Sequence, residues 1–232
     1  MFFGIVALLP VLLRAQSSDS RQELWPGADV YVNLNDESRF YFTYSATREN
    51  ELSDYADGQV GAYFDYYTLP LARRRLRELP DASRDNFLMF RVGYLYSKTP
   101  AGALKPSTKH IPTVEADPRA PLPWDMLLTD RNRLELRIVN GDFEPQYRNR
   151  LRLERNFRTG RFVLTPYVDG EAFYNWKYHA FDEFRYTAGL EWRVLRFLVL
   201  EEYYTRQRNT KSSPQYVNAL GVTVQVHLRQ KQ

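Results

Sequence analysis

Two stretches near the middle of the chain place a charged or strongly polar residue at every second position. They read RNRLELR from residue 131 and RNRLRLER from residue 148, and Asn140-Gly141 lies between them. Successive side chains of a β-strand point to opposite faces, so each stretch carries charges on one face and apolar residues on the other. A helix would scatter the charges around its circumference. Because Asn-Gly favours a hairpin turn, the two stretches predict adjacent antiparallel strands.

The same alternation recurs in eleven runs along the chain. The runs are residues 24–35, 39–48, 60–71, 87–98, 109–120, 124–139, 146–157, 162–175, 184–194, 197–208 and 215–228. A closed sheet whose two chain ends lie on the same side has an even number of strands, so we expect about 12 strands, or about 10 if one run is a loop. The run 109–120 is the weakest of these predictions, because it contains Pro112 and Pro118. Proline removes a donor from the ladder of hydrogen bonds.

The last run shows which face meets which environment. Its residues Leu220, Val222, Val224, Val226 and Leu228 alternate with Ala219, Gly221, Thr223, Gln225 and His227. The apolar set is expected to face lipid and the other set to face the lumen. A sheet that is polar inside and apolar outside is typical of a closed barrel in a membrane. The predicted fold is therefore all-β, an antiparallel transmembrane β-barrel of the outer-membrane type.

Orientation follows from the short turns in the last third of the chain. If the C-terminus lies in the periplasm, residues 158–161 and 194–196 form periplasmic turns, and residues 140–142, 176–180 and 209–214 lie outside. Aromatic residues gather near both sets of turns. One group is Phe157, Phe162, Trp192 and Phe197, and the other is Tyr174, Trp176, Tyr178 and Phe184. Two aromatic girdles are expected where a barrel crosses both membrane interfaces.

Length and composition limit the domain organisation. The chain has 232 residues, 15% of them aromatic and 26% charged, with no cysteine. After an apolar segment at residues 2–13, which predicts a secretory signal over residues 1–16, residues 17–232 suffice for one barrel. The alternative for the segment is a buried first strand. A formal net charge of +4, with both signs interleaved, disfavours nucleic-acid binding.

The charged face predicts a lumen lined by arginine and carboxylate side chains. The expected lumen residues on the four clearest strands are Arg131, Arg133, Glu135, Arg137, Arg148, Arg150, Arg152, Glu154, Asp169, Glu171, Arg185, Glu191 and Arg193. The planar guanidinium favours paired hydrogen bonds to carboxylates on neighbouring strands. Such a network would brace a narrow barrel, and the arginine surplus would instead favour anions if the lumen is open.

Catalytic and metal-binding patterns are weak. The three histidines, His110, His179 and His227, lie in different runs or loops. His179 with Asp182 and Glu183 forms a candidate acid-base or metal site in an outer loop, but a solvated loop is the favoured interpretation. No histidine is tied by spacing to Ser212 or Ser213. We expect no catalytic residue, no metal site, since cysteine is absent, and no cofactor.

Four segments resemble a known family. They are LLTDRNRLELRI, YRNRLRLER, TPYVDGEAFYNW and YVNALGVTVQV. Together they are similar to the outer-membrane barrel family called domain of unknown function 2490, over most of the mature chain and best from Leu127 onward. The resemblance implies a barrel in a Gram-negative outer membrane and no defined activity.

The expected function is therefore a structural barrel or one that passes small solutes, anions among them. The expected partners are outer-membrane lipid and the barrel-assembly machinery, and the expected location is the outer membrane after removal of the signal. Two alternatives stay open: a hydrolase with a site at the outer rim, and a soluble periplasmic barrel that binds a small ligand.

Overall fold

The computed structural model describes residues 20–49, 54–70, 84, 86–100, 106–159 and 162–229. Strands account for most of them. The strands are β1 (Ser20–Asn33), β2 (Ser38–Glu49), β3 (Asp54–Pro70), β4 (Asn86–Lys98), β5 (Thr108–Leu122), β6 (Met126–Glu135), β7 (Ile138–Val139), β8 (Asp142–Phe143), β9 (Gln146–Arg155), β10 (Phe157–Thr159), β11 (Phe162–Asn175), β12 (Ala180–Leu195), β13 (Leu198–Asn209) and β14 (Tyr216–Arg229). Within this described part, no helix has the length and apolar character needed to cross a membrane.

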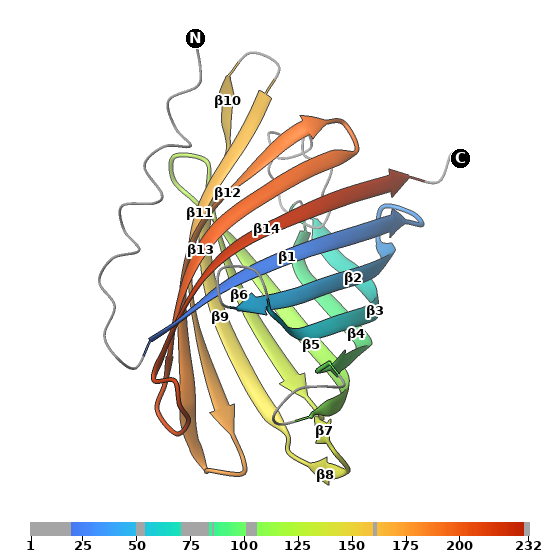
Figure 1. Cartoon of the computed structure of the whole chain (residues 1–232). Coiled ribbons are helices and arrows are strands. Elements are labelled where there is room, and N and C mark those ends of the chain that lie inside the picture. Colours follow the sequence, from blue (N-terminus) through green and yellow to red (C-terminus); the bar gives the residue numbers. More distant parts are fainter. Residues whose placement is uncertain are drawn as a thin grey trace.

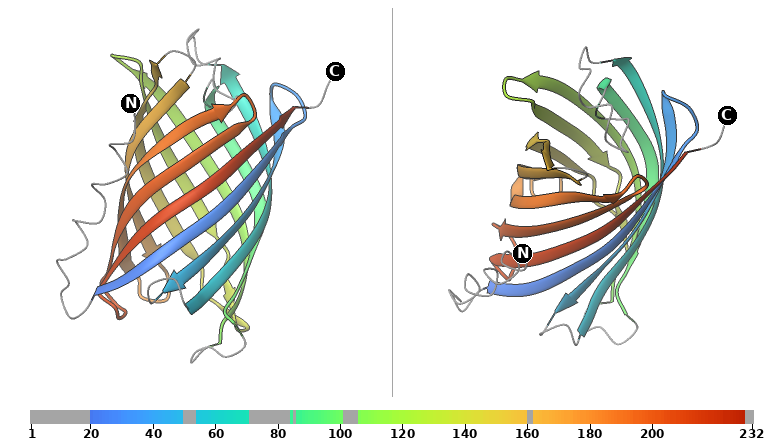
Figure 2. Two further views of the ribbon diagram at one scale, coloured as in Figure 1. Left: turned by 45° about the horizontal axis from the view of Figure 1, so that its top comes forward. Right: turned by 90° about the horizontal axis from the view of Figure 1, so that it is seen from above.

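Eleven of these strands close into one barrel (Figures 1 and 2). The order around the ring is β4-β3-β2-β1-β14-β13-β12-β11-β9-β6-β5, and β5 pairs with β4 to complete it. The short strands extend the wall locally. β7 pairs with β5 beyond the end of β6, β8 pairs with β7, and β10 pairs with β11 beyond the end of β9. The predicted transmembrane barrel architecture is confirmed.

The strand number is odd, one fewer than the 12 expected. All eleven predicted runs contain strands, and the described residues add no further strand to the ring. The ring closes through a parallel pairing of β1 with β14, from Ser20 opposite Tyr216 to Asn33 opposite Arg229. Figure 1 shows both arrows pointing the same way. The even-number rule requires both chain ends on one side, whereas parallel closure puts the start of β1 and the end of β14 at opposite ends.

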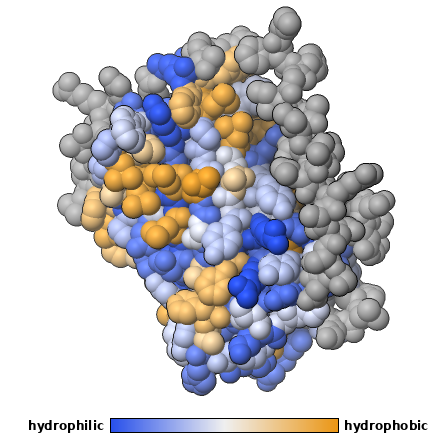
Figure 3. Space-filling view, turned by 90° about the vertical axis from the view of Figure 1, so that its left-hand side faces the viewer, coloured by the Kyte–Doolittle hydropathy of each residue, from blue (hydrophilic) through white to orange (hydrophobic). Residues whose placement is uncertain are grey.

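The two faces of the wall follow the predicted alternation. On β14, Val222 and Val224 are 40% and 41% exposed, whereas the intervening Thr223 is only 9% exposed. Large apolar side chains are exposed on most other strands too, and clusters of them are visible in Figure 3. The buried residues include many charged side chains, such as Asp65, Arg91 and Glu115. The barrel is therefore polar inside and apolar outside, as a lipid environment requires.

Strand β5 forms in spite of its prolines. Its pairing with β4 is continuous from Thr108 to Pro118. On its other edge, β5 pairs with β7 at Lys109–His110 and with β6 at Thr113–Ala116 and Arg119–Leu122. Pro112 and Pro118 both fall in the gaps between these paired stretches. A missing N–H donor is tolerated there, because the ladder on that edge is already interrupted.

The predicted turns group at the two ends as expected. Residues 196–197 lie at the end of the barrel where β14 finishes, and residues 176–179 and 210–215 lie at the opposite end. Aromatic contacts mark both ends. Phe162 and Trp192 lie 5.8 Å apart between ring centroids near the first, and Tyr174 lies 5.5 Å from Trp176 near the second. These contacts match the positions of the two expected girdles; the membrane side of each end stays a prediction.

The outer face also carries a polar patch that the alternation did not predict. Asn149 on β9 donates hydrogen bonds to Asp130 (2.7 Å) and Asn132 (3.1 Å) on β6, and the Tyr147 hydroxyl donates to Asn132 (2.5 Å). Asp130 and Asn132 flank the inward-facing Arg131, and Tyr147 and Asn149 flank the inward-facing Arg148. Since successive side chains of a strand point to opposite faces, all four point outward. The mutual hydrogen bonds satisfy polar groups that lipid cannot.

Candidate functional site

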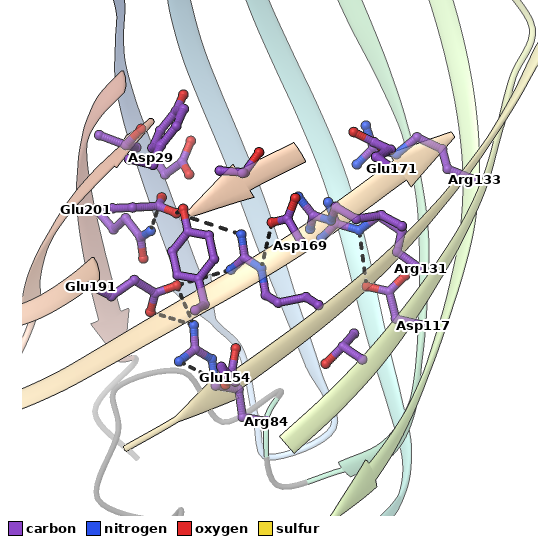
Figure 4. A pocket seen from close by; sticks show the side chains of 18 of the residues that line it. Asp29, Arg84, Asp117, Arg131, Arg133, Glu154, Asp169, Glu171, Glu191 and Glu201 are labelled. Atoms are coloured by element: carbon purple, nitrogen blue, oxygen red, sulfur yellow. Dashed lines mark hydrogen bonds and ion pairs between the residues drawn. The ribbon is translucent and has the colours of Figure 1, made fainter. Parts of the chain in front are cut away.

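The lumen encloses a polar cavity of about 320 Å³, and this is the candidate site. Its walls come from strands all around the ring. Figure 4 shows Arg131, Arg133 and Asp117 on one wall, with Asp29 and Glu201 across the cavity. Arginine dominates the lining because the inward positions of β6 and β9 alternate through Arg131, Arg133, Arg148, Arg150 and Arg152.

A continuous ladder of ion pairs begins on β2. Arg39 pairs with Asp65 on β3 (2.7 Å), and Asp65 also pairs with Arg91 on β4 (2.6 Å). Arg91 reaches Glu115 on β5 (3.6 Å), and Glu115 accepts from Arg133 on β6 (2.5 Å). Asp65 and Glu115 are fully or almost fully buried. Burial of such carboxylates is tolerated only when cations compensate them.

The ladder continues from β6 to β12. Glu135, which follows Arg133 on the same face, pairs with Arg148 on β9 (2.6 Å), and Arg148 pairs with Glu171 on β11 (2.9 Å). Glu171 lies 3.7 Å from Arg185 on β12, which pairs in turn with Glu183 (2.9 Å). Alternating charges therefore link eight consecutive strands of the ring, from β2 to β12.

Cation–π contacts connect the two ends of the ladder to β1. The guanidinium of Arg39 lies 4.2 Å from the ring centroid of Tyr31, and that of Arg185 lies 5.2 Å from Trp25. Tyr31 also stacks on Tyr41 of β2, with 4.7 Å between centroids. Arginine over an aromatic face is electrostatically favourable. These contacts bring both ends of the ladder to β1, the strand that closes the ring by pairing with β14.

A second cluster centres on Arg152 of β9. Arg152 contacts Asp169 of β11 (3.3 Å), Glu191 of β12 (3.3 Å) and Glu201 of β13 (3.8 Å), so it reaches over several strands. Glu201 also accepts a hydrogen bond from Tyr167 (2.5 Å). Only one of the adjacent residues Glu201 and Glu202 faces the lumen, as the alternation requires: Glu201 is buried and Glu202 is exposed.

Arg84 enters the lumen from the connection between β3 and β4. Its guanidinium pairs with Glu191 on β12 (2.5 Å) and with Glu154 on β9 (3.3 Å). Figure 4 shows it beside both carboxylates. Arg84 thereby links two carboxylates of the wall formed by β9 and β12. Residues 71–83 of this connection, whose sequence is compatible with a helical loop or with an extension of the strand, lie outside the described residues.

Most of the predicted lumen residues line the cavity. These are Arg131, Arg133, Arg148, Arg150, Arg152, Glu154, Asp169, Glu171, Arg185 and Glu191. Three of the predicted residues lie elsewhere. Glu135 is buried behind the lining between Arg133 and Arg148. Arg137 donates to Gln146 beyond the end of β6, and Arg193 lies near the end of β12.

The prediction from sequence missed the charged residues of the first five strands. These are Asp29, Arg39, Asp65, Arg91, Glu115, Asp117 and Arg119. They follow the same alternation, but tyrosine, glycine and threonine occupy many of the inward positions between them. The run TVEADPR at residues 113–119 carried the clearest signal, because Glu115, Asp117 and Arg119 recur at every second position.

The histidines do not assemble into a catalytic group. His110 is exposed beside Tyr94, His179 lies in the turn before β12, and His227 lies inside the barrel, stacked on Tyr31 (4.6 Å). In the described part of the chain, no group of three or more histidine and carboxylate side chains is placed to hold a metal ion. Asp182 accepts from Asn175 (3.0 Å), and no hydrogen bond joins it to His179 among these residues.

Comparisons with known proteins identify a family but no activity. No curated protein matches the chain. Among solved structures, the β domain of the Bordetella autotransporter BrkA is similar to it, with 13% sequence identity, a TM-score of 0.45, and coverage of 80% of this chain and 81% of that one. The model of the family described as protein of unknown function (DUF2490) matches residues 77–218, well over half of the chain. The chain therefore belongs to the DUF2490 family.

Proposed function

We propose that the protein is a structural β-barrel of the Gram-negative outer membrane, held in a narrow shape by its lumen ion pairs. Lipid and the assembly machinery that inserts barrels are its partners in this proposal. The apolar outer face and the two aromatic clusters support a membrane location. The observation that carries the structural role is the ladder from Arg39 to Glu183, because it ties eight neighbouring strands together through buried charges.

Glu171 is the best place to test the ladder. It lies between Arg148 (2.9 Å) and Arg185 (3.7 Å), and its side chain is almost fully buried. Removing its charge takes one of two carboxylate partners from Arg148 and from Arg185, which keep Glu135 and Glu183. Breaking one buried ion pair costs about 3 to 5 kcal/mol. We expect Glu171→Gln to lower the free energy of unfolding by an amount in this range, measured by urea titration in detergent or lipid.

Glu202→Gln is the matched control, because Glu202 lies on β13 with its side chain on the outer face. Neutralising an outward carboxylate removes no lumen contact, so this variant should unfold at the wild-type urea concentration or above it. If Glu171→Gln is as stable as Glu202→Gln, the lumen charges are water-screened and the bracing role is wrong.

A second candidate function is passage of small anions. Ten arginines line the cavity against seven carboxylates, a surplus of three positive charges. Such a surplus raises the local concentration of anions. In this case planar bilayers containing the protein would show large conductance steps, and a salt gradient would give a reversal potential of the sign set by anions.

A further inference from the structure

Arg150 differs from the other lumen arginines of β9. Its neighbours Arg148 and Arg152 each pair with carboxylates, whereas Arg150 has no ion pair within 4.0 Å in the described part of the chain. Its Nε is buried and has no hydrogen-bond acceptor. Most buried polar atoms in folded proteins have such a partner, so this one calls for an explanation.

The nearby carboxylates are already engaged. Glu171, directly opposite Arg150 on β11, is held by Arg148 and Arg185. Asp169 is held by Arg152. On the other side, the residue directly opposite Arg150 is Arg131 of β6, which has the same charge. Arg131 pairs with Asp117 (3.5 Å), as Arg152 pairs with Asp169 (3.3 Å), so Arg150 is the arginine of these three that has no ion pair in the described part of the chain. All three arginines line the cavity.

We propose that this part of the lumen binds a small oxyanion, held by Arg150 and the adjacent Arg131 and Arg152. A guanidinium presents two parallel N–H donors that match two oxygens of a phosphate, sulfate or carboxylate group. The cavity volume of about 320 Å³ lies at the lower end of the range for small-molecule sites, which favours a compact anion. An oxyanion there would supply the acceptor that Arg150 lacks and would balance its unpaired positive charge, while Arg131 and Arg152 would each add a donor.

This site lies within the lumen of the proposed barrel. The inference rests on the proposed function in one respect, that the lumen is a narrow polar space. Inorganic phosphate is the probe. The full chain, refolded in detergent in a chloride-free buffer, is titrated with phosphate in a calorimeter. We expect saturable binding to the wild type and at least tenfold weaker binding to Arg150→Gln. Arg150→Lys, which keeps the charge but not the paired donors, should fall between them.

Arg206→Gln is the control, because Arg206 is exposed on the outer face of β13 and its loss also lowers the net charge by one. Its phosphate affinity should equal that of the wild type. Absence of saturable binding to the wild type, or equal weakening by Arg150→Gln and Arg206→Gln, would overturn the proposal. Both variants are first shown to be folded by their heat-modifiable migration on gels.

The two proposals fail in different measurements. The bracing role is refuted if Glu171→Gln unfolds at the same urea concentration as the wild type, whatever the affinity for phosphate. The anion site is refuted if the calorimeter shows no saturable binding of phosphate to the wild type, whatever the stability of Glu171→Gln. Arg150→Gln should also unfold at a higher urea concentration than the wild type in phosphate-free buffer, because it removes repulsion without breaking an ion pair.

Discussion

Val168 offers a direct test of how the barrel sits in lipid. It lies on the outer face of β11, 54% exposed, with Leu153 and Ala188 as its cross-strand neighbours. Phe162 and Tyr174, which belong to the two aromatic clusters, are each six residues away on the same strand. At about 3.4 Å per residue, these six residues span roughly 20 Å along the tilted strand, so Val168 lies near the middle of an apolar band about 25 Å tall.

An arginine at Val168 should therefore cost about 2 to 4 kcal/mol of unfolding free energy, the range found at the bilayer midplane. Leu164 and Ala172 lie on the same face, four residues from Val168 toward Phe162 and toward Tyr174, respectively. The added charge in Leu164→Arg or Ala172→Arg should therefore cost about 0 to 1 kcal/mol, the range found near the interfaces. Val168→Leu controls for shape and should stay close to the wild type. The assay is reversible urea unfolding in lipid vesicles. Equal penalties at the three depths would refute the assignment of this face to the membrane interior.

Three further predictions follow from individual contacts. A Cβ on Gly189 would lie 2.5 to 2.8 Å from the Tyr167 ring, so Gly189→Ala should cost about 1 to 3 kcal/mol in urea unfolding, whereas Gly170→Ala, whose nearest neighbour lies at 3.8 Å, should be mild; equal effects would contradict the packing. Arg84→Ala removes a guanidinium that pairs with Glu154 and Glu191 inside the lumen and should increase conductance in planar bilayers; unchanged conductance would show that Arg84 does not narrow the lumen. Lys177 is exposed and pairs with Glu144 (2.5 Å), so Lys177→Ala should leave urea unfolding unchanged, and measurable destabilisation would refute this.

The strands were predictable because the two faces of this wall meet opposite environments. The run 162–175 matches β11 residue for residue, since every second side chain from Leu164 to Tyr174 must suit lipid. The start of β3 was missed: the strand begins at Asp54, but residues 54–59 contain too few apolar side chains to show an alternation. Local pattern therefore fails where a strand extends beyond the apolar band.

Closure and cross-lumen contacts were beyond the reach of a local pattern. The parallel pairing of β1 with β14 joins residues almost 200 positions apart, and no alternation specifies which strands meet there. Arg84 lies in a segment without strand periodicity, yet it pairs with Glu154 and Glu191 on the far wall. The lack of an ion pair at Arg150 could not be predicted either, because Arg148, Arg150 and Arg152 occupy equivalent positions in the alternating pattern. They differ in whether a carboxylate on another strand lies within reach, and Arg148 and Arg152 have such partners.

The central claim is that ion pairs brace and narrow the lumen, and single-channel recording of the wild-type protein in planar bilayers tests it most directly. The ladder links eight strands, and Arg152 and Arg84 reach over the cavity, so the conductance should be close to the baseline of the bilayer. The recording is made in 1 M salt, because this concentration screens surface charges but not buried ion pairs. Glu171→Gln should then raise the conductance. Large, steady conductance steps from the wild type, with the same size in Glu171→Gln, would contradict the account.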